Sequence, residues 1–195
     1  MWSAQLKHDK LAAMTQRLFH VSEEPGLADF HPRPAPAVVP NVGTPPAAID
    51  EPIVWAIDEA HLPNYLLPRD CPRVCYGPSN DMTPDDARLF FPVRGPRRMI
   101  AAEEAWRDRI GATHLYIYEL PPHAFRLHDI NAGYWVAPIR VSKLREFEID
   151  DLPAEIEQRG AELIYLPSLW PLFDAVTHSS VSYSAIRMRN ARPRT

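Results

Sequence analysis

The residues near the start of the chain that are best suited to chemistry are His20 and Ser22, in the stretch LFHVSEE (18–24). If this stretch is a strand, Leu18, His20 and Ser22 share one face and the residues between them share the other. An imidazole can hydrogen-bond a sugar hydroxyl through one nitrogen while a neighbour fixes the other. Two interpretations follow: a core or sheet-edge histidine bonded to a backbone carbonyl, or a histidine that positions a ligand at a cleft.

A second group of polar and aromatic residues lies in VWAIDEAHLPNY (54–65), which contains Trp55 and Tyr65. A tyrosine shortly after a strand is often simple packing, and the alternative is a platform on which a nucleobase or nicotinamide ring stacks. Asp58 and Glu59 are interpreted as caps of the following turn. Tyr134, in GYWVAP (133–138), completes the aromatic candidates.

Two arginines flank an aspartate in PRDCPR (68–73), and two prolines stiffen this stretch. One interpretation is a turn that Asp70 pins by pairing with an arginine. The other is that Arg69 and Arg73 meet a phosphate or carboxylate, because two guanidinium groups beside one carboxylate keep spare donors. We expect the stretch to form a stiff shelf at the rim of a cleft.

Several kinds of site lack their sequence signatures. Cys71 and Cys75 have no second cysteine pair, and the chain contains no H-E-x-x-H motif, so no metal site is expected. The chain has no G-x-S-x-G nucleophile elbow and no glycine-rich phosphate loop. In the stretch HSSVSYSAIRMRNA (178–191), Arg187 and Arg189 are expected to share a strand face and to form surface pairs.

The elements that must position these residues are mostly short strands. Strands are predicted in the stretches LFHVS, IVWAI, RVCYG, HLYIYEL, FRLHDI, YWVAPI, REFEI, AELIYLP and SYSAIRM. Helices are predicted in TPDDARLFF, RRMIAAEEAWRDRIGA, DDLPAEIEQ and SLWPLFDAVTH. Thr83 and Pro84 form a typical helix start, and Gly111 is the expected stop of the second helix. Short strands without regular strand–helix alternation predict an α+β fold with mainly antiparallel sheets.

The start of the chain and the segment from residue 25 to residue 52 show no clear helix or strand pattern. We expect residues 1–16 to be a leader or extension that contributes little to the core, and residues 17–195 to form one globular domain. From Pro25 to Pro52 the chain is rich in proline, which predicts an ordered loop with extended pieces.

Composition limits the classes of function. The net charge of -4 and the pI near 6.1 argue against general nucleic-acid or membrane-surface binding. The sequence has no apolar run long enough for a membrane span and no secretory signal, and its two cysteines exclude a disulfide framework, so a cytoplasmic location is expected. The oligomeric state cannot be read from these features.

The segments LFHVSEEPGLADFHPRP, VWAIDEAHLPNYLLPRDCPRV and GYWVAP resemble those of a small bacterial family of unknown function. The resemblance covers residues 17 to about 191 and implies no established activity.

A more distant resemblance is to the ADP-ribosyltransferase-like fold, which includes RNA 2'-phosphotransferases and DNA-modifying toxins. LFHVS is similar to the first-strand motif of that fold, and VWAIDEAHLPNY is similar to its second. The fold's third motif is a glutamate on a later strand; GYWVAP has none, which leaves Glu119 and Glu148 as substitutes. The resemblance implies two sheets packed around a cleft, with a few short helices.

The function that this resemblance implies is binding of NAD or a nucleotide-like small molecule, with glycosyl, ADP-ribosyl or phosphoryl transfer if the protein is an enzyme. NAD would then be a substrate. His20 and Ser22 would hold a ribose, Tyr65 would stack on a base, and Arg69 and Arg73 would meet phosphate, with Trp55 and Tyr134 completing the ligand-binding set. The alternative is a non-catalytic ligand-binding or structural module in which His20 and Tyr65 belong to the core.

Overall fold

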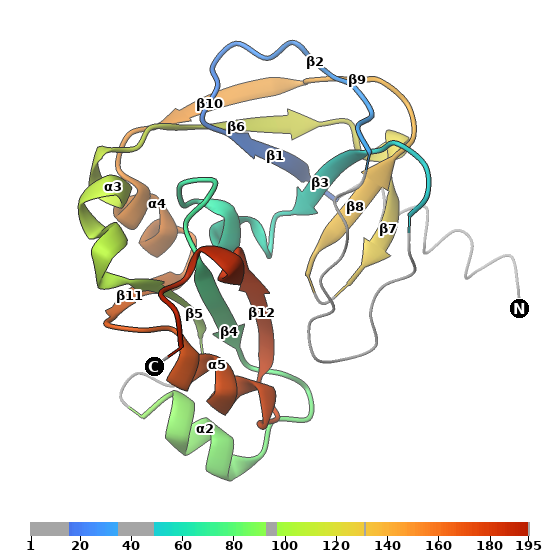
Figure 1. The fold of residues 1–195 in the computed structure, drawn as a ribbon. Helices are drawn as coiled ribbons and strands as arrows, with labels where there is room; N and C mark the ends of the chain where they lie inside the picture. Colours follow the sequence, from blue (N-terminus) through green and yellow to red (C-terminus); the bar gives the residue numbers. More distant parts are fainter. Residues whose placement is uncertain (1–15, 35–48, 93–96, 131, 195) are drawn as a thin grey trace, which may run out of the picture. The chain divides into compact units, whose positions relative to one another are not determined.

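The computed structural model describes residues 16–34, 49–92, 97–130 and 132–194 of the chain (Figure 1). These residues form two compact units. Unit 1 consists of the described residues within 16–34, 49–62 and 116–148, and unit 2 of those within 63–115 and 149–194. Each unit contains its own sheet, and the expected α+β class with mainly antiparallel pairing is confirmed.

Unit 1 is built on a six-stranded sheet with the order β10-β6-β1-β3-β8-β7. Its strands are β1 (Leu18–Ser22), β3 (Val54–Asp58), β6 (Leu115–Leu120), β7 (Arg126–Asp129), β8 (Tyr134–Ala137) and β10 (Arg145–Ile149). A two-stranded sheet of β2 (Asp29–Phe30) and β9 (Val141–Ser142) accompanies it. The pairs of β1 with β3 and β6, and of β8 with β3 and β7, are all antiparallel.

One face of the unit 1 sheet carries a hydrophobic core, called here the core face. Its buried members are Leu18, Val54, Ala56, Tyr118, Leu120 and Ala137 from the large sheet and Phe30 and Val141 from the small one. Because side chains alternate along a strand, the register places His20 and Ser22 on this face with Leu18, as the sequence predicted. Phe19, Trp55 and Tyr134 lie on the opposite face.

Unit 2 is built on a four-stranded sheet with the order β11-β5-β4-β12. Its strands are β4 (Arg73–Gly77), β5 (Arg98–Glu103), β11 (Ala161–Leu166) and β12 (Ser182–Ile186). The helices of this unit are η1 (Leu62–Tyr65), which begins at the end of unit 1, α2 (Pro84–Phe90), η2 (Glu104–Trp106), α3 (Arg107–Ala112), α4 (Leu152–Gln158), α5 (Trp170–Thr177) and η4 (Met188–Asn190). A further short helix, η3 (Pro122–Ala124), belongs to unit 1. β5 pairs with β11 in parallel and with β4 antiparallel.

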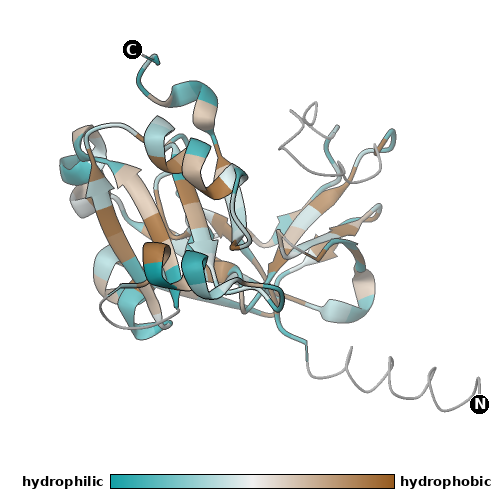
Figure 2. Cartoon of the chain, turned by 90° about the horizontal axis from the view of Figure 1, so that it is seen from below, coloured by the Kyte–Doolittle hydropathy of each residue, from teal (hydrophilic) through white to brown (hydrophobic). Residues whose placement is uncertain are grey.

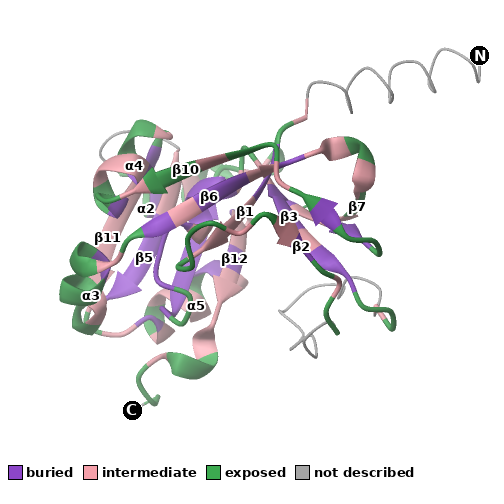
Figure 3. Cartoon of the chain, turned by 90° about the horizontal axis from the view of Figure 1, so that it is seen from above, coloured by how far each residue is buried: buried purple, intermediate pink, exposed green. Residues whose placement is uncertain are grey.

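The strands of unit 2 are its most apolar and most buried part (Figures 2 and 3). All five residues of β4 are buried, as are the last four of β5. Val74, Tyr76 and Ala101 pack with side chains of α2 and α5, among them Phe90 and Val176. β4 therefore holds the centre of unit 2, between β5 and β12.

Two helices of unit 2 begin as their sequences predict. The Thr83 hydroxyl accepts a hydrogen bond from the Asp86 amide at 3.2 Å, and Pro84 is the first residue of α2. At α4 the Asp151 carboxylate accepts from the Ala154 amide at 3.0 Å. Each cap satisfies an amide that the first helical turn leaves without a partner.

The helix predicted over residues 97–112 is wrong in its first half. Residues 98–103 form the strand β5, and helix begins only at Glu104. Met99–Ala102 is a short continuous apolar run, which is typical of a strand buried on both faces, whereas the prediction relied on the spacing of Ile100, Trp106 and Ile110. Gly111 is not a stop, because α3 continues to Ala112.

Two predictions lie wholly or largely outside the described residues. The leader at residues 1–16 has only its last residue described, and the proline-rich segment has none of residues 35–48 described. The described part of that segment contains β2 and an isolated bridge between Arg33 and Ile53, which fits the expected extended pieces. Among the described residues, no helix is long and apolar enough to cross a membrane.

Candidate functional site

The most distinctive local geometry in unit 1 surrounds His20 on β1. β1 pairs with β6 along all five of its residues, but its register with β3 covers only Leu18 and Phe19. Beyond Phe19 the carbonyl oxygen of Trp55 on β3 lies 3.0 Å from Nδ1 of His20. The imidazole therefore takes the place of a ladder hydrogen bond where β1 and β3 cease to pair.

This contact determines the role of each nitrogen of the His20 ring. A carbonyl oxygen can only accept a hydrogen bond, so Nδ1 carries a proton. In the neutral ring Nε2 then has the lone pair and acts as an acceptor. The ring is held by Phe30, whose centroid lies 4.8 Å away, and Phe30 in turn packs edge-on to Tyr118 at 5.3 Å.

Ser22 continues the core face from His20 towards the end of β1. Its hydroxyl oxygen accepts a hydrogen bond from the Glu24 amide at 3.0 Å. On the neighbouring strand Tyr116 lies opposite Ser22 in the register, and the Tyr116 hydroxyl donates to Oε1 of Glu148 at 3.0 Å. Three adjacent strands thus bring a histidine, a serine and a carboxylate to one face of the sheet.

A second carboxylate of β10 is occupied by structural bonds. Glu146 Oε1 accepts from the Gly26 amide at 2.9 Å, and the other oxygen pairs with Lys143. The Lys143 bond lowers the pKa of Glu146, and the Gly26 amide adds to this effect. Tyr118 donates to the Glu24 carbonyl at 2.7 Å, and burial raises the pKa of Tyr118. These bonds fix the chain that follows β1.

Glu119, the other candidate for the missing glutamate, lies on the opposite face from His20, because it pairs with Phe19. Its carboxylate accepts from Nε of Arg17 at 3.1 Å and from Nη2 at 3.2 Å. The hydrogen bond from Arg17 lowers the pKa of Glu119. Of the two substitutes that the sequence offers, Glu148 is therefore the one linked to the face of His20.

The side chains of Trp55 and Tyr134 meet on the face opposite His20. Their ring centroids are 5.1 Å apart in an edge-on arrangement, and His128 contacts Trp55 at 5.6 Å. Burial lowers the pKa of His128, and its Nε2 is a buried atom without a hydrogen-bond partner among the described residues. The seven predicted site residues therefore fall into separate groups, with His20 and Ser22 on one face and Trp55 and Tyr134 on the other.

The turn that follows β3 in unit 1 is capped by Asp58, as the sequence predicts. Oδ1 of Asp58 accepts from the His61 amide at 2.9 Å and lies 2.7 Å from Nδ1 of the same residue. Gly133 packs against this ring with a φ of 69°, and a Cβ there would overlap the imidazole.

Arg73, expected to meet a phosphate, is buried in unit 2 with a relative exposure of 4%. Nε donates to the Asn64 carbonyl at 2.8 Å, and Nη1 donates to the carbonyls of Pro68 and Cys71 at 3.3 and 3.0 Å. The guanidinium also lies over the Tyr65 ring, 5.8 Å from its centroid. This geometry favours a structural role, in which Arg73 holds the PRDCPR loop from within.

Arg69 and Asp70 are exposed at the tip of the same loop. The turn is held through their backbone: Arg187 Nε donates to the Arg69 carbonyl at 3.3 Å, and Asn190 Nδ2 donates to the Asp70 carbonyl at 2.7 Å. The expected pinning by the Asp70 carboxylate is not found among the described residues, because Arg73 is satisfied by carbonyl groups instead.

The two thiols beside Arg73 are free and buried. Burial raises the pKa of Cys71 to about 12 and that of Cys75 to about 11, against a partial opposing effect of Arg73. A thiol that stays protonated is a poor nucleophile and a poor metal ligand.

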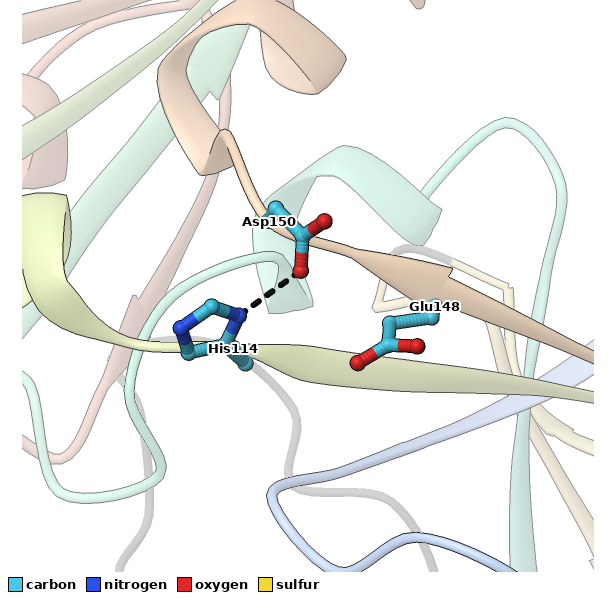
Figure 4. A group of neighbouring side chains, drawn as sticks. All are labelled: His114, Glu148 and Asp150. Carbon is cyan, nitrogen blue, oxygen red and sulfur yellow. Dashed lines mark hydrogen bonds and ion pairs between the residues drawn. The ribbon is translucent and has the colours of Figure 1, made fainter.

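His114 and Asp150 form an exposed hydrogen-bonded pair in unit 2, with Nδ1 and Oδ1 2.7 Å apart (Figure 4). Glu148, drawn in the same figure, belongs to unit 1. Within unit 2 the pair supplies two possible ligand atoms, fewer than the three or four protein ligands of zinc sites. Exposed pairs of this kind are common on protein surfaces.

Sequence reasoning missed Tyr116 as an orienting residue and Arg73 as a buried cation. The alternation in HLYIYEL shows that Tyr116 shares a face with Tyr118, but it does not show which residues of other strands lie opposite. For Arg73 a signal was present, since it opens an apolar run that forms β4, one of the two inner strands of its sheet.

Comparison with known proteins gives a family but no activity. No curated protein and no solved structure matches the chain. A family model described as "Family of unknown function (DUF6886)" matches residues 19–191, which is most of the chain. The chain therefore belongs to this family of unknown function, DUF6886.

Proposed function

We propose that unit 1 binds a nucleotide-like small molecule, with NAD as the leading candidate, on the core-face side of β1. The observation that carries the proposal is the hydrogen bond between His20 Nδ1 and the Trp55 carbonyl where β1 and β3 part. It fixes the ring, and in the neutral ring Nε2 is then an acceptor to which a ribose hydroxyl can donate. Ser22, two residues further along the same face, offers a hydroxyl proton to the same sugar.

The proposal includes a carboxylate for glycosyl transfer. Cleavage of the bond between nicotinamide and ribose develops positive charge on the sugar, and a nearby carboxylate stabilises that charge. Glu148 is suited to this role because the Tyr116 hydroxyl orients it and Tyr116 lies opposite Ser22. In this proposal Glu148 has the role that the third-motif glutamate has in the ADP-ribosyltransferase-like fold.

Two of the predicted residues have altered roles in this proposal. Trp55 contributes its backbone carbonyl, while its side chain packs with Tyr134 on the other face. Tyr65 and Arg73 have a structural explanation in unit 2, where the guanidinium lies over the ring. The ligand set in unit 1 is then His20, Ser22 and Glu148.

A non-catalytic module is the second candidate, and the packing of Phe30 favours it. The Phe30 ring lies 4.8 Å from His20 and belongs to the core, so the imidazole is itself a packing element. In this case His20 stabilises the sheet, and no sugar contacts it.

Calorimetric titration with NAD, ADP-ribose and AMP, together with an assay of nicotinamide release, tests the proposal. Glu148→Gln keeps an acceptor for Tyr116, so it should bind NAD within a few-fold of wild type and lose nicotinamide release. Glu104→Gln changes an exposed glutamate of unit 2 and is the matched control. If wild type binds none of the three ligands at millimolar concentration, the proposal is wrong. If it binds NAD without releasing nicotinamide, the part of the proposal that concerns glycosyl transfer is wrong and unit 1 only binds the ligand.

A further inference from the structure

Residues 191–194 follow η4 in unit 2 and form neither helix nor strand. Ala191 has an extended backbone, with φ -67° and ψ 156°, and the ring of Pro193 restricts the backbone that follows. Arg192, Pro193 and Arg194 are exposed. These residues are therefore an extended, basic segment on the surface of unit 2.

Side chains of unit 2 bind both backbone polar groups of Arg192. The two carboxylate oxygens of Glu103 accept from the Arg192 amide at 3.1 and 3.2 Å, and the Trp170 indole donates to the Arg192 carbonyl at 2.6 Å. Nη1 of Arg192 also donates to the Pro167 carbonyl at 3.3 Å. Every residue except proline has the same backbone groups, so the two backbone contacts exclude only proline at this position.

The side chain of Arg194 is bound through its planar guanidinium group. Nη1 and Nη2 donate to the two carboxylate oxygens of Asp174 at 3.2 and 2.9 Å, and the group lies over the Trp170 ring, 4.3 Å from its centroid. This paired donation suits arginine and not lysine, because an ammonium group has no planar fork. The four residues that hold the segment are called the receiving site: Glu103, Pro167, Trp170 and Asp174.

Glu103 makes the receiving site suited to a peptide amide. Its relative exposure is 1%, and it ends the buried part of β5. Among the described residues, the Arg192 amide is the one donor to this carboxylate. A buried carboxylate without a donor is costly, so another donor must replace the amide if the segment leaves. A second peptide supplies this amide together with the carbonyl that Trp170 binds.

The turn before the segment is anchored separately. Arg187 has a φ of 55°, which makes it the one described residue other than glycine in the left-handed region, and it turns the chain from β12 into η4. Arg187 Nε donates to the Arg69 carbonyl, and Asn190 Nδ2 donates to the Asp70 carbonyl. The strand face that Arg187 and Arg189 were expected to share is therefore not formed, and neither makes an ion pair with a carboxylate in the described part of the chain. Because these bonds hold η4, residues 191–194 can leave the receiving site while η4 stays in place.

We propose that the receiving site binds an extended, arginine-containing segment of a partner protein, and that residues 191–194 occupy the site until that segment replaces them. The partner segment has an arginine two residues after the residue whose backbone is bound. The carboxylates of Glu103 and Asp174 complement its positive charge. A second copy of the chain offers the same segment, but that segment competes with one already tethered beside the site at a high effective concentration. The site belongs to unit 2 alone and does not depend on the proposed function of unit 1.

Fluorescence anisotropy with a labelled peptide of the sequence 190–194 tests this inference in the full-length chain. Arg194→Ala weakens the chain's own occupant, so this variant should bind the peptide about fivefold or more tightly than wild type. Adding Asp174→Asn to Arg194→Ala should remove this gain, because in that background only the added peptide uses Asp174. A peptide with alanine in place of its last arginine should bind the Arg194→Ala protein about tenfold or more weakly, because it loses the charge-assisted pair. Lysine at the same place should also weaken binding.

The control is Arg88→Ala, which removes an exposed ion pair with Asp85 in α2 and should bind the peptide as wild type does. Arg194 and Asp174 are about as exposed as a surface pair, so the variants should fold, and their melting curves check this. The inference would be overturned if the Arg194→Ala protein bound no peptide at millimolar concentration, or if it bound the peptide no better than wild type. A wild-type dimer that dissociates in Arg194→Ala would assign the site to a second copy and overturn the assignment to a partner protein.

Discussion

Nδ1 of His20 lies 3.0 Å from the carbonyl oxygen of Trp55, at the point where β1 stops pairing with β3. This contact fixes the orientation of the imidazole before any ligand arrives. A ring held in this way loses little freedom on binding, which favours a role in recognition.

Replacement of Arg73 by methionine should destabilise unit 2. The change removes a buried guanidinium and leaves the carbonyls of Asn64, Pro68 and Cys71 without their donors. Because each buried acceptor without a partner is costly, we expect a loss of about 3 kcal/mol or more. Chemical denaturation followed by tryptophan fluorescence measures it.

Asp70→Ala provides the contrast on the same loop. The Asp70 side chain is exposed, and the bond to Asn190 uses its backbone carbonyl, which the substitution keeps. The expected loss is under about 1 kcal/mol. A loss as large as that of Arg73→Met would contradict the view that Arg73, and not Asp70, holds the loop.

The two buried thiols predict a specific dependence of stability on pH. Their pKa values are about 12 and about 11 in the folded protein, against an ordinary value of 9.0 in the unfolded chain. Below the unfolded pKa both states keep the proton, so the thiols contribute no pH dependence. Between the two values only the unfolded chain releases protons, so the free energy of unfolding should fall as the pH rises above 9.

A Cys71→Ala, Cys75→Ala double variant should lose much of that decline between pH 9 and pH 11. Thiol labelling of the native wild type at pH 8 should also be slow, and it should become fast in denaturant. Rapid labelling of both cysteines in the native protein would contradict their burial.

The C-terminal segment should stabilise unit 2 through Glu103. This carboxylate has a relative exposure of 1%, and its two oxygens accept from the Arg192 amide at 3.1 and 3.2 Å. The Trp170 indole donates to the Arg192 carbonyl at 2.6 Å, and Arg194 pairs with Asp174. Ending the chain after Asn190 should lower the melting temperature, because a buried carboxylate loses its partner.

Glu103→Gln in the shortened chain is the discriminating variant. It removes the buried charge, so it should recover part of the lost stability, whereas in the full-length chain it should be destabilising. Calorimetric melting of the four proteins measures this sign change. If Glu103→Gln destabilises both lengths equally, the segment does not act through Glu103.

The sequence predicted strands and helices well where apolar and polar residues alternate clearly or where a capping residue marks the start of a helix. The strands 73–77 and 145–149 and the start of α2 at Pro84 lie where the sequence placed them. The prediction of a helix from residue 97 was wrong because an alanine-rich apolar run suits either a helix or a strand that is buried on both faces. Here the run lies between β4 and β11 and forms a strand.

The candidate site was less predictable because it depends on register. The alternation in LFHVS correctly separates His20 from Phe19, but only the pairing of β1 with β6 shows that Ser22 meets Tyr116. A shift of one residue in the pairing of two strands would move every side chain of the shifted strand to the other face of the sheet. Nothing in the local pattern fixes the pairing of distant strands. For the same reason Trp55 and His20 could not be assigned to opposite faces from the sequence.

The central claim is that His20 contacts a bound nucleotide, and the most direct test is the rise in melting temperature that NAD causes in wild type, His20→Asn and His20→Ala. A ligand at 100 times its dissociation constant stabilises a protein by about 2.7 kcal/mol, which shifts its melting temperature by several degrees. We predict a clear rise in wild type, a smaller one in His20→Asn, which keeps a polar group at this position, and none in His20→Ala. Without ligand, His20→Ala should lose only about 1 kcal/mol of stability, because the Trp55 carbonyl loses one hydrogen bond. The claim would be contradicted if NAD raised the melting temperature equally in all three proteins. It would also be contradicted if His20→Ala without ligand lost about 2–5 kcal/mol of stability, which is the loss expected for a core residue.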